Sequence, residues 1–233
     1  SGLENAVLIV DEPQVMDEGV WLPFLKMLEA GAEMLGWQAV LVSATMPPVH
    51  YLKQPVVSLS EEKGVFPNRY FVRIAERSVS EKDLAKWVTD ASDHYLCQAV
   101  IMNTIEDVAR LSKEIQSLEK NVNLLHLSGA MTPLHKRLQI LRMKQALQQT
   151  LDTPLLVIST QVIEAGVDIS FERIYRALPI FPSIVQAAGR VNRHAQGEKQ
   201  GELIVFPFLR EGKTDNRKWV YRNSIFGSVK KFV

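Results

Sequence analysis

The chain has 233 residues, of which 46% are hydrophobic and 23% charged, and its formal net charge is +1. This composition is typical of a globular protein with one large or two modest domains, and it excludes collagen-like and low-complexity chains. The single cysteine, Cys97, excludes an intrachain disulfide and a cysteine-rich zinc site, which favours a reducing, cytoplasmic environment. No apolar run reaches the length of a membrane span and the N-terminus lacks a signal-peptide pattern, so we expect no membrane partner.

Strand and helix patterns alternate along the first part of the chain. Continuous apolar runs at 6–10 and 39–42 are typical of buried parallel strands. Between them, apolar residues recur with a helical period over 21–35, and Gly36 follows where a helix would end. The order strand, helix, strand predicts an α/β fold with a parallel sheet.

Prolines and a glycine interrupt this alternation between residues 47 and 67, which is typical of a linker rather than of a sheet interior. We therefore place a domain boundary near Phe66 and expect domains at 1–66 and 67–208, followed by a tail at 209–233. In the second domain the expected strands are 69–75, 99–102, 123–127, 155–159, 174–177 and 203–206, and the expected helices are 81–95, 105–118, 133–147 and 183–188.

The C-terminal tail is basic although the chain as a whole is nearly neutral. Residues 208–233 contain seven Lys or Arg against two acidic residues, Glu211 and Asp215, which gives a local charge of +5. A basic end of this kind is either a solvated tail or an arm that touches nucleic acid or leads to a further domain.

Polar residues that could carry chemistry follow the two expected strands of the first domain. Asp11 and Glu12 end the first strand, and a carboxylate pair there can hold Mg²⁺ through water and position a water for attack on a phosphate. Acidic residues also end many ordinary strands. Ser43, Ala44 and Thr45 follow the second strand, where their hydroxyls could hydrogen-bond to the acidic pair.

Two further segments lie in the second domain. In ISTQVIEAGVDI (158–169), the hydroxyl and main-chain N–H of Thr160 follow a strand and are placed to bind a phosphate oxygen. Gly166 permits close approach of a ligand, and Asp168 can accept a hydrogen bond from a ribose hydroxyl.

In QAAGRVNR (186–193), a helix would bring Gln186, Gly189, Arg190 and Arg193 onto one face. Arg190 and Arg193 would then form a guanidinium clamp suited to a triphosphate, although two surface arginines on an amphipathic helix would give the same pattern. Four aromatic residues could stack on bases, but their spacing favours packing in the core: Trp21, Tyr70, Phe71 and Trp87.

Taken together and in this order, the segments DEPQ (11–14), SAT (43–45), STQVIEAGVDI (159–169) and QAAGRVNR (186–193) resemble motifs II, III, V and VI of superfamily 2 helicases. Within that superfamily the chain is most similar to the helicase portion of the CRISPR-associated helicase-nuclease of type I systems. The core EAGVD of motif V, a segment IMNTI (101–105) that resembles motif IV, and the following LLHLSGAMTPLHKR carry this resemblance.

The resemblance implies a RecA-like parallel sheet with flanking helices, in which a complete second lobe follows the C-terminal part of a first lobe. It implies ATP and Mg²⁺ as cofactors, single-stranded DNA and an RNA-guided CRISPR surveillance complex as partners, and a nuclease domain on the same or a separate chain. The implied catalytic residues are Asp11, Glu12, Gln186, Arg190 and Arg193, with Asp11 and Glu12 holding Mg²⁺ through water. Gly166 and Asp168 would bind the nucleotide together with the two arginines. Asn103, Thr104 and Thr160 would bind the DNA. Ser43 and Thr45 would couple ATP hydrolysis to DNA binding.

The sequence departs from the family pattern at two points. Gln14 stands where motif II usually ends in His or Asp, and no phosphate-binding loop G-x-x-x-x-G-K-[ST] precedes motif II. The stretch from Gly31 to Gly36 has the glycine spacing but lacks the Lys and lies in an expected helix. We therefore expect a fragment that hydrolyses no ATP by itself.

Two alternative functions remain open at this point. A helicase-like module without an ATP loop could bind only a partner or a strand, although the intact arginine pair argues against such decay. A lobe of an RNA helicase is the other alternative, but motif VI of those proteins commonly begins with His rather than Gln186.

Overall fold

The computed structural model describes residues 4–43, 46–59, 68–148, 153–164, 167–179, 181–193 and 200–210. The chain forms two compact units, residues 1–65 and 66–233. The division falls within the proline-rich stretch, beside the boundary expected at Phe66. Residues of the tail from 211 onward lie outside the described part, so the two interpretations of the basic tail stay open.

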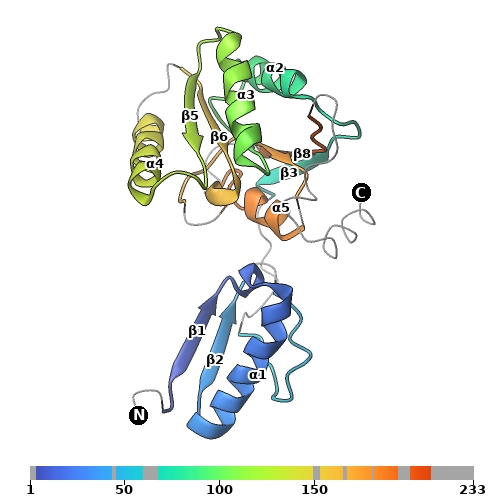
Figure 1. Cartoon of the computed structure of the whole chain (residues 1–233), viewed down its shortest axis with the longest axis vertical. Helices are drawn as coiled ribbons and strands as arrows, with labels where there is room; N and C mark the ends of the chain where they lie inside the picture. The colour runs from blue at the N-terminus through green and yellow to red at the C-terminus, as the bar shows by residue number, and fades with distance from the viewer. Residues whose placement is uncertain are drawn as a thin grey trace. The chain divides into compact units, whose positions relative to one another are not determined.

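The first unit contains a parallel pair of strands, β1 (Val7–Asp11) and β2 (Gln38–Val42), joined by helix α1 (Glu18–Leu35) (Figure 1). Asp17 begins the helix by accepting a hydrogen bond from the Gly19 N–H, and a 3₁₀ turn (Pro13–Val15) precedes it. Gly36 ends the helix with φ of 68°, a left-handed conformation that glycine adopts without steric cost. Gly31 lies inside α1, so the apparent phosphate-loop spacing is a helix and its cap.

The second unit is a six-stranded parallel sheet with the strand order β3-β8-β7-β4-β6-β5. The continuous apolar runs expected as strands are strands, with ends that differ by at most two residues. The strands are β3 (Tyr70–Ile74), β4 (Cys97–Ile101), β5 (Asn123–Leu127), β6 (Leu155–Ser159), β7 (Arg173–Ala177) and β8 (Gly201–Phe206).

Helices cover both faces of this sheet (Figure 1). Alternate residues of β4 enter two separate apolar cores, because successive side chains of a strand point to opposite faces. Val100 packs with α2 (Glu81–Ala91) and α3 (Ile105–Ser117), whereas Ala99 and Ile101 pack on the face of α4 (Pro133–Gln148) and α5 (Phe181–Ala188). The predicted α/β class with flanking helices is therefore confirmed.

Strand polarity decides where functional residues gather in this unit. β7, β4, β6 and β5 are neighbours and parallel, so the residues that follow each strand emerge at one edge of the sheet. Those residues include Asn103 after β4, Thr160 after β6 and Leu178 after β7. In open parallel sheets this carboxyl edge is where ligands bind.

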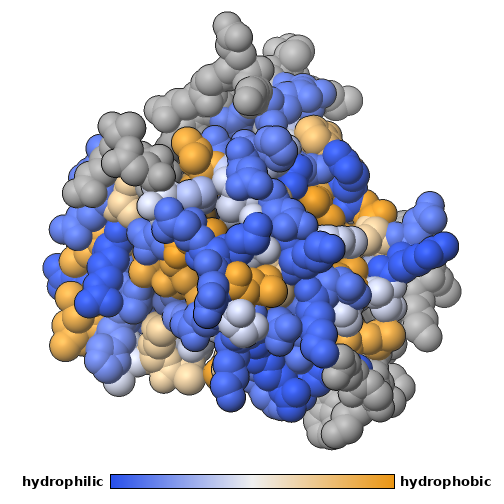
Figure 2. Space-filling model, turned by 90° about the horizontal axis from the view of Figure 1, so that it is seen from above, coloured by the Kyte–Doolittle hydropathy of each residue, from blue (hydrophilic) through white to orange (hydrophobic). Residues whose placement is uncertain are grey.

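The surface is mixed in character. On the face shown in Figure 2, hydrophilic residues predominate and hydrophobic ones are interspersed among them. Among the described residues, no helix has the length and apolar character required to cross a lipid bilayer. Several large apolar side chains are exposed on β1 and on the edge strand β3, including Val7, Ile9, Phe71 and Ile74.

Candidate functional site

Motifs II and III meet through Gln14 in the first unit. Asp11 ends β1, and Glu12 follows in a left-handed conformation (φ 53°, ψ 50°) with its N–H donating to the Val42 carbonyl at 2.8 Å. The Gln14 side-chain amide donates to the Glu12 carboxylate, and the Ser43 hydroxyl donates to the Gln14 amide oxygen. Gln14 therefore joins the two motifs through its amide, although it departs from the usual motif II residue.

Asp11 and Glu12 are the candidate residues for holding Mg²⁺. The side chains of Asp11 and Glu12 are exposed and adjacent in sequence. Among the described residues, no group of three or more His, Cys, Asp and Glu side chains could enclose a metal ion. Two exposed carboxylates suit a magnesium ion held largely by water and phosphate, which is the ordinary mode of Mg²⁺ binding. Thr45, the second expected coupling residue, lies outside the described residues.

Thr160 follows β6 at the carboxyl edge and is 5% exposed. Its N–H donates to the Leu127 carbonyl at 3.1 Å, and its hydroxyl accepts from the Gly129 N–H at 3.2 Å. The expectation of a main-chain N–H directed at a phosphate is therefore wrong, because that N–H joins the ends of β5 and β6. The hydroxyl keeps its own proton to donate, and contact of Thr160 with nucleic acid stays a prediction.

Motif IV residues differ in the direction of their side chains. Thr104 begins α3: its hydroxyl accepts from the Asp107 N–H and donates to the Asp107 carboxylate at 2.6 Å. Asn103 is 5% exposed, and its amide donates to the Leu178 carbonyl at 3.2 Å and accepts from Arg176 at 2.7 Å. This buried amide does not match the nucleic-acid contact expected of Asn103, because both of its polar groups are used within the protein.

Motif VI is only partly helical. Helix α5 ends at Ala188, and the chain turns through Gly189 and Arg190, so the single helical face expected for Gln186, Gly189, Arg190 and Arg193 does not form. Glycine is a poor helix former, which is consistent with the helix ending before it. Gln186 lies on α5 and is partly buried.

The two arginines of motif VI nevertheless both reach motif V. Arg190 donates from Nε and Nη2 to the Glu164 carbonyl at 3.2 and 2.9 Å. Arg193 forms an ion pair with Asp168, with 3.3 Å between Nη1 and Oδ1, and its N–H donates to the Ser170 hydroxyl at 2.9 Å. Of the four expected nucleotide-binding residues, the structure thus pairs Asp168 with Arg193 and places Arg190 on the Glu164 carbonyl. Gly166, the fourth, lies outside the described residues.

Arg190 and Arg193 differ in how they are held. The Arg193 side chain is 38% exposed and its partner Asp168 is 64% exposed, so water screens this ion pair and it contributes little. Arg190 is half-buried and its Nε and Nη2 donate two hydrogen bonds that converge on one carbonyl oxygen, which restricts the guanidinium. Arg193 is therefore the guanidinium that can move to an incoming phosphate at lower cost.

A buried ion pair that the sequence did not indicate lies beneath this arrangement. Arg176 on β7 and Glu164 of motif V are 0% and 3% exposed, with 2.7 Å between Arg176 Nε and Glu164 Oε1. Burial raises the pKa of Glu164, while Arg176 and a hydrogen bond from the Ser183 hydroxyl act in the opposite direction. A charged residue inside an apolar strand pattern, RIYRA, is the sequence signal that could have found it.

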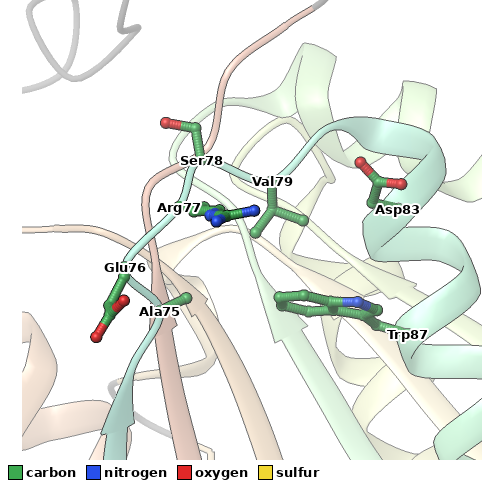
Figure 3. A pocket seen from close by; sticks show the side chains of 7 residues that line it. All are labelled: Ala75, Glu76, Arg77, Ser78, Val79, Asp83 and Trp87. Atoms are coloured by element: carbon green, nitrogen blue, oxygen red, sulfur yellow. The ribbon is translucent and has the colours of Figure 1, made fainter.

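The aromatic residues divide between core and surface. Trp21 is buried, as expected, and its indole N–H donates to the Pro48 carbonyl at 2.8 Å. Trp87 and Phe71, by contrast, are 42% and 39% exposed, so packing in the core is the wrong interpretation for both. Trp87 forms one wall of a surface cavity of about 480 Å³ (Figure 3). Glu76 and Asp83 outnumber Arg77 around it, which disfavours a phosphate there.

Known proteins with similar sequences include Cas3 nuclease/helicases. Residues 94–196 match the family model described as CRISPR-associated nuclease/helicase Cas3, C-terminal. The Cas3 nuclease/helicase of Methanothermobacter thermautotrophicus is 26% identical over 225 residues, which cover 86% of this chain and 26% of the relative. The chain resembles the helicase portion of Cas3. The matched range contains motifs IV, V and VI.

Solved structures with a similar fold include helicases. T. fusca Cas3 with ATP has a TM-score of 0.64 at 18% identity, and the match covers 97% of this chain and 33% of that one. The Mycobacterium smegmatis helicase Lhr, bound to single-stranded DNA and AMP-PNP, has a TM-score of 0.59 at 16% identity and covers 86% and 28%. These similarities establish the RecA-like α/β fold. The chain spans about a third or less of the length of these relatives.

Proposed function

We propose that this chain supplies the second lobe, and part of the first, of an ATP-dependent single-stranded DNA translocase that acts in type I CRISPR interference, an antiviral defence. The observation that carries the proposal is the joining of motifs V and VI: Arg190 binds the Glu164 carbonyl, and Arg193 pairs with Asp168. Two guanidiniums held against motif V of a RecA-like domain suit recognition of a nucleotide polyphosphate.

In this proposal Arg193 is the arginine that contacts the terminal phosphate of ATP. Its exposed, water-screened pair with Asp168 can be exchanged for a phosphate, which leaves the Asp168 carboxylate to accept from a ribose hydroxyl. An arginine at that position stabilises the charge that develops during phosphoryl transfer. Arg190 and Gln186 would add further contacts to the nucleotide from motif VI, and Gly166 would permit its close approach.

In this proposal the first unit holds Mg²⁺ and couples ATP hydrolysis to DNA binding. Asp11 and Glu12 would hold Mg²⁺ through water and orient the attacking water. Bound ATP and Mg²⁺ would supply the phosphoryl group and the charge that these residues recognise. The hydrogen-bonded series from Glu12 through Gln14 to Ser43 supports a coupling role for motif III, shared with Thr45.

Single-stranded DNA would follow the carboxyl edge of the sheet. Thr160 follows β6 and carries the hydroxyl proposed to contact a phosphate, whereas the Thr104 hydroxyl after the adjacent β4 is already bonded to Asp107 and Arg210. Hydroxyl contacts to phosphates carry no sequence information. Such neutral contacts suit a translocase, which must release and regain the strand at every step. We further propose a cytoplasmic protein that an RNA-guided CRISPR surveillance complex recruits, with a nuclease domain on the same or a separate chain.

The test is ATP turnover by the full-length natural protein that contains this chain, with and without nucleic acid. We expect single-stranded DNA to stimulate hydrolysis and single-stranded RNA of the same sequence to stimulate it much less. Stronger stimulation by RNA would favour the RNA helicase alternative. No ATP hydrolysis under any of these conditions would favour the ATP-deficient binding module instead.

Residues 1–233 alone should hydrolyse no ATP. The sequence contains no G-x-x-x-x-G-K-[ST], so no loop of main-chain N–H groups and lysine cradles the β- and γ-phosphates, and two arginines cannot replace it. Turnover by this chain above background, lost in Arg193→Ala, would contradict this part of the proposal.

A further inference from the structure

Arg176 is a cation in the middle of an apolar sheet. It lies on β7, its side chain is fully buried, and it is the largest side chain buried to that degree among the described residues. Burial of a guanidinium is costly unless ion pairs and hydrogen bonds compensate it. An apolar residue would fill the same strand position at lower cost, so simple packing does not explain the arginine.

The partners of Arg176 come from segments far apart in the sequence. Its Nη1 donates to the Asn103 side chain at 2.7 Å and to the Ala177 carbonyl at 2.7 Å, and it lies 3.4 Å from the Ile101 carbonyl. Its Nε pairs with Glu164 at 2.7 Å. One guanidinium therefore contacts the end of β4, which precedes Thr104, and the turn of motif V.

Glu164 extends this network to motif VI. Its carbonyl accepts both hydrogen bonds of Arg190, and its carboxylate accepts from the Ser183 hydroxyl on α5. The position of the Glu164 main chain therefore fixes Arg190, and the Glu164 side chain is in turn held by Arg176. Residues of motifs IV and VI therefore each contact one member of the buried Arg176–Glu164 pair, and Glu164 itself belongs to motif V.

We propose that Arg176 is a positioning residue that links the DNA-facing end of β4 to the nucleotide-facing arginines through Glu164. The inference rests on the proposed function, and it assigns a coupling role to a residue outside the helicase motifs. A displacement at the end of β4 changes the geometry at Glu164, and with it the placement of Arg190. The guanidinium fork suits this role because it holds several acceptors in one plane, which the single ammonium of lysine cannot do.

The experiment compares Arg176→Met, Arg176→Lys and the double variant Arg176→Met with Glu164→Leu in the full-length protein. Replacing both members of a buried ion pair by apolar residues is often neutral for stability. We therefore expect the double variant to fold even where Arg176→Met alone lowers the stability. We measure thermal unfolding, the Kd for single-stranded DNA, and kcat and KM for ATP with saturating DNA.

We expect all folded variants, including the double variant, to lose at least tenfold in DNA-stimulated kcat, while the KM for ATP changes less than threefold. Arg176→Lys should retain the charge opposite Glu164 without restoring kcat. A double variant with wild-type kcat would overturn the proposal, because the pair would then serve folding alone. Arg193→Ala, measured in the same experiment, distinguishes the positioning role of Arg176 from the proposed function. If Arg193→Ala abolishes ATP turnover while Arg176→Met does not, only the positioning role of Arg176 is contradicted. Absence of stimulated turnover in the wild-type protein would instead count against the proposed function.

Discussion

Individual residues of this chain acquire their roles from neighbours that are distant in sequence. The hydroxyl and strand-end position of Thr160 were predictable from the segment itself, but the partner of its N–H, Leu127, lies on another strand. In the same way, the sequence offered Arg190 and Arg193 as an equivalent pair, whereas only tertiary contacts distinguish a fixed guanidinium from an exposed one. The role of Arg176 was not predicted, because one polar residue does not change the apolar pattern by which a buried strand is recognised.

Removal of the Thr160 hydroxyl should weaken binding of single-stranded DNA by about two- to tenfold, the value of one hydrogen bond of about 0.5–1.5 kcal/mol. We would titrate DNA into Thr160→Ala of the full-length protein and follow fluorescence anisotropy. Thr153→Ala is the matched control, because Thr153 precedes β6 at the opposite edge of the sheet. Unchanged DNA affinity together with a collapse of ATP turnover in the absence of DNA would assign Thr160 to the nucleotide side.

The thiol of Cys97 should be inert in the native state. Burial, and to a smaller extent the charge of Glu172, raise its pKa from 9.0 to about 12. Because the folded pKa exceeds the unfolded one, the free energy of unfolding should fall as pH rises from about 9 towards 12. Iodoacetamide at pH 9 should label the chain only in denaturant, and Cys97→Ala should remove part of the alkaline loss of stability. Rapid labelling of the native chain would contradict the assigned burial.

At the scale of elements, the sequence predicted which segments form strands and helices, and most of the expected helix ends agree with the structure to within one residue. Continuous apolar runs are sufficient to identify parallel strands, and all the expected strands are present. The helix expected over 81–95 ends at Ala91, and α5 ends before the motif VI arginines. Those ends depend on caps and turns, such as the Gly189–Arg190 turn, and helical periodicity does not register them.

The start of α3 depends on a residue near the end of the described chain. Arg210 pairs with the fully buried Asp107 at 2.6 Å and donates to the Thr104 hydroxyl at 3.2 Å. Arg210→Met should therefore lower the free energy of unfolding by about 2–4 kcal/mol, since it leaves a buried carboxylate without its cation. Chemical denaturation of residues 1–233 measures this change.

Arg110→Met is the control for that measurement. It removes an exposed i,i+4 pair with Glu106 on the same helix, so its effect should be much smaller. Equal losses in the two variants would mean that Arg210 does not support Asp107 in the way that its contacts indicate.

At the scale of the whole molecule, the two units bury very different amounts of apolar surface. In the second unit every residue of β4 and β6 is buried. In the first, Val7, Ile9 and Val42 of the paired strands are 58%, 72% and 47% exposed, and the described apolar core consists of Trp21, Leu25 and Leu28. A two-stranded sheet depends on packing against further apolar surface for its stability, and in the first unit one helix, α1, supplies it.

Amide hydrogen exchange of residues 1–233 should therefore reveal unequal stability. We expect the amides of β1 and β2 to exchange at least tenfold faster than those of β4 and β6, because protection follows the local free energy of opening. Mass spectrometry of peptic fragments measures both regions in one experiment. Equal protection of the two sheets would show that unit 1 is stabilised by contacts other than those described within it.

The central claim is that motif VI provides an arginine for phosphoryl transfer and not for DNA binding. The most direct measurement is kcat for DNA-stimulated ATP hydrolysis and the DNA Kd, both determined on Arg193→Ala of the full-length protein. Arg142→Ala, which removes an exposed arginine of α4 in the same unit, is the control. We predict a loss of kcat on the order of 10³-fold for Arg193→Ala, with a DNA Kd within about twofold of the wild-type value. A loss of less than about tenfold in kcat, or a loss confined to DNA affinity, would contradict the assignment of Arg193 to the nucleotide.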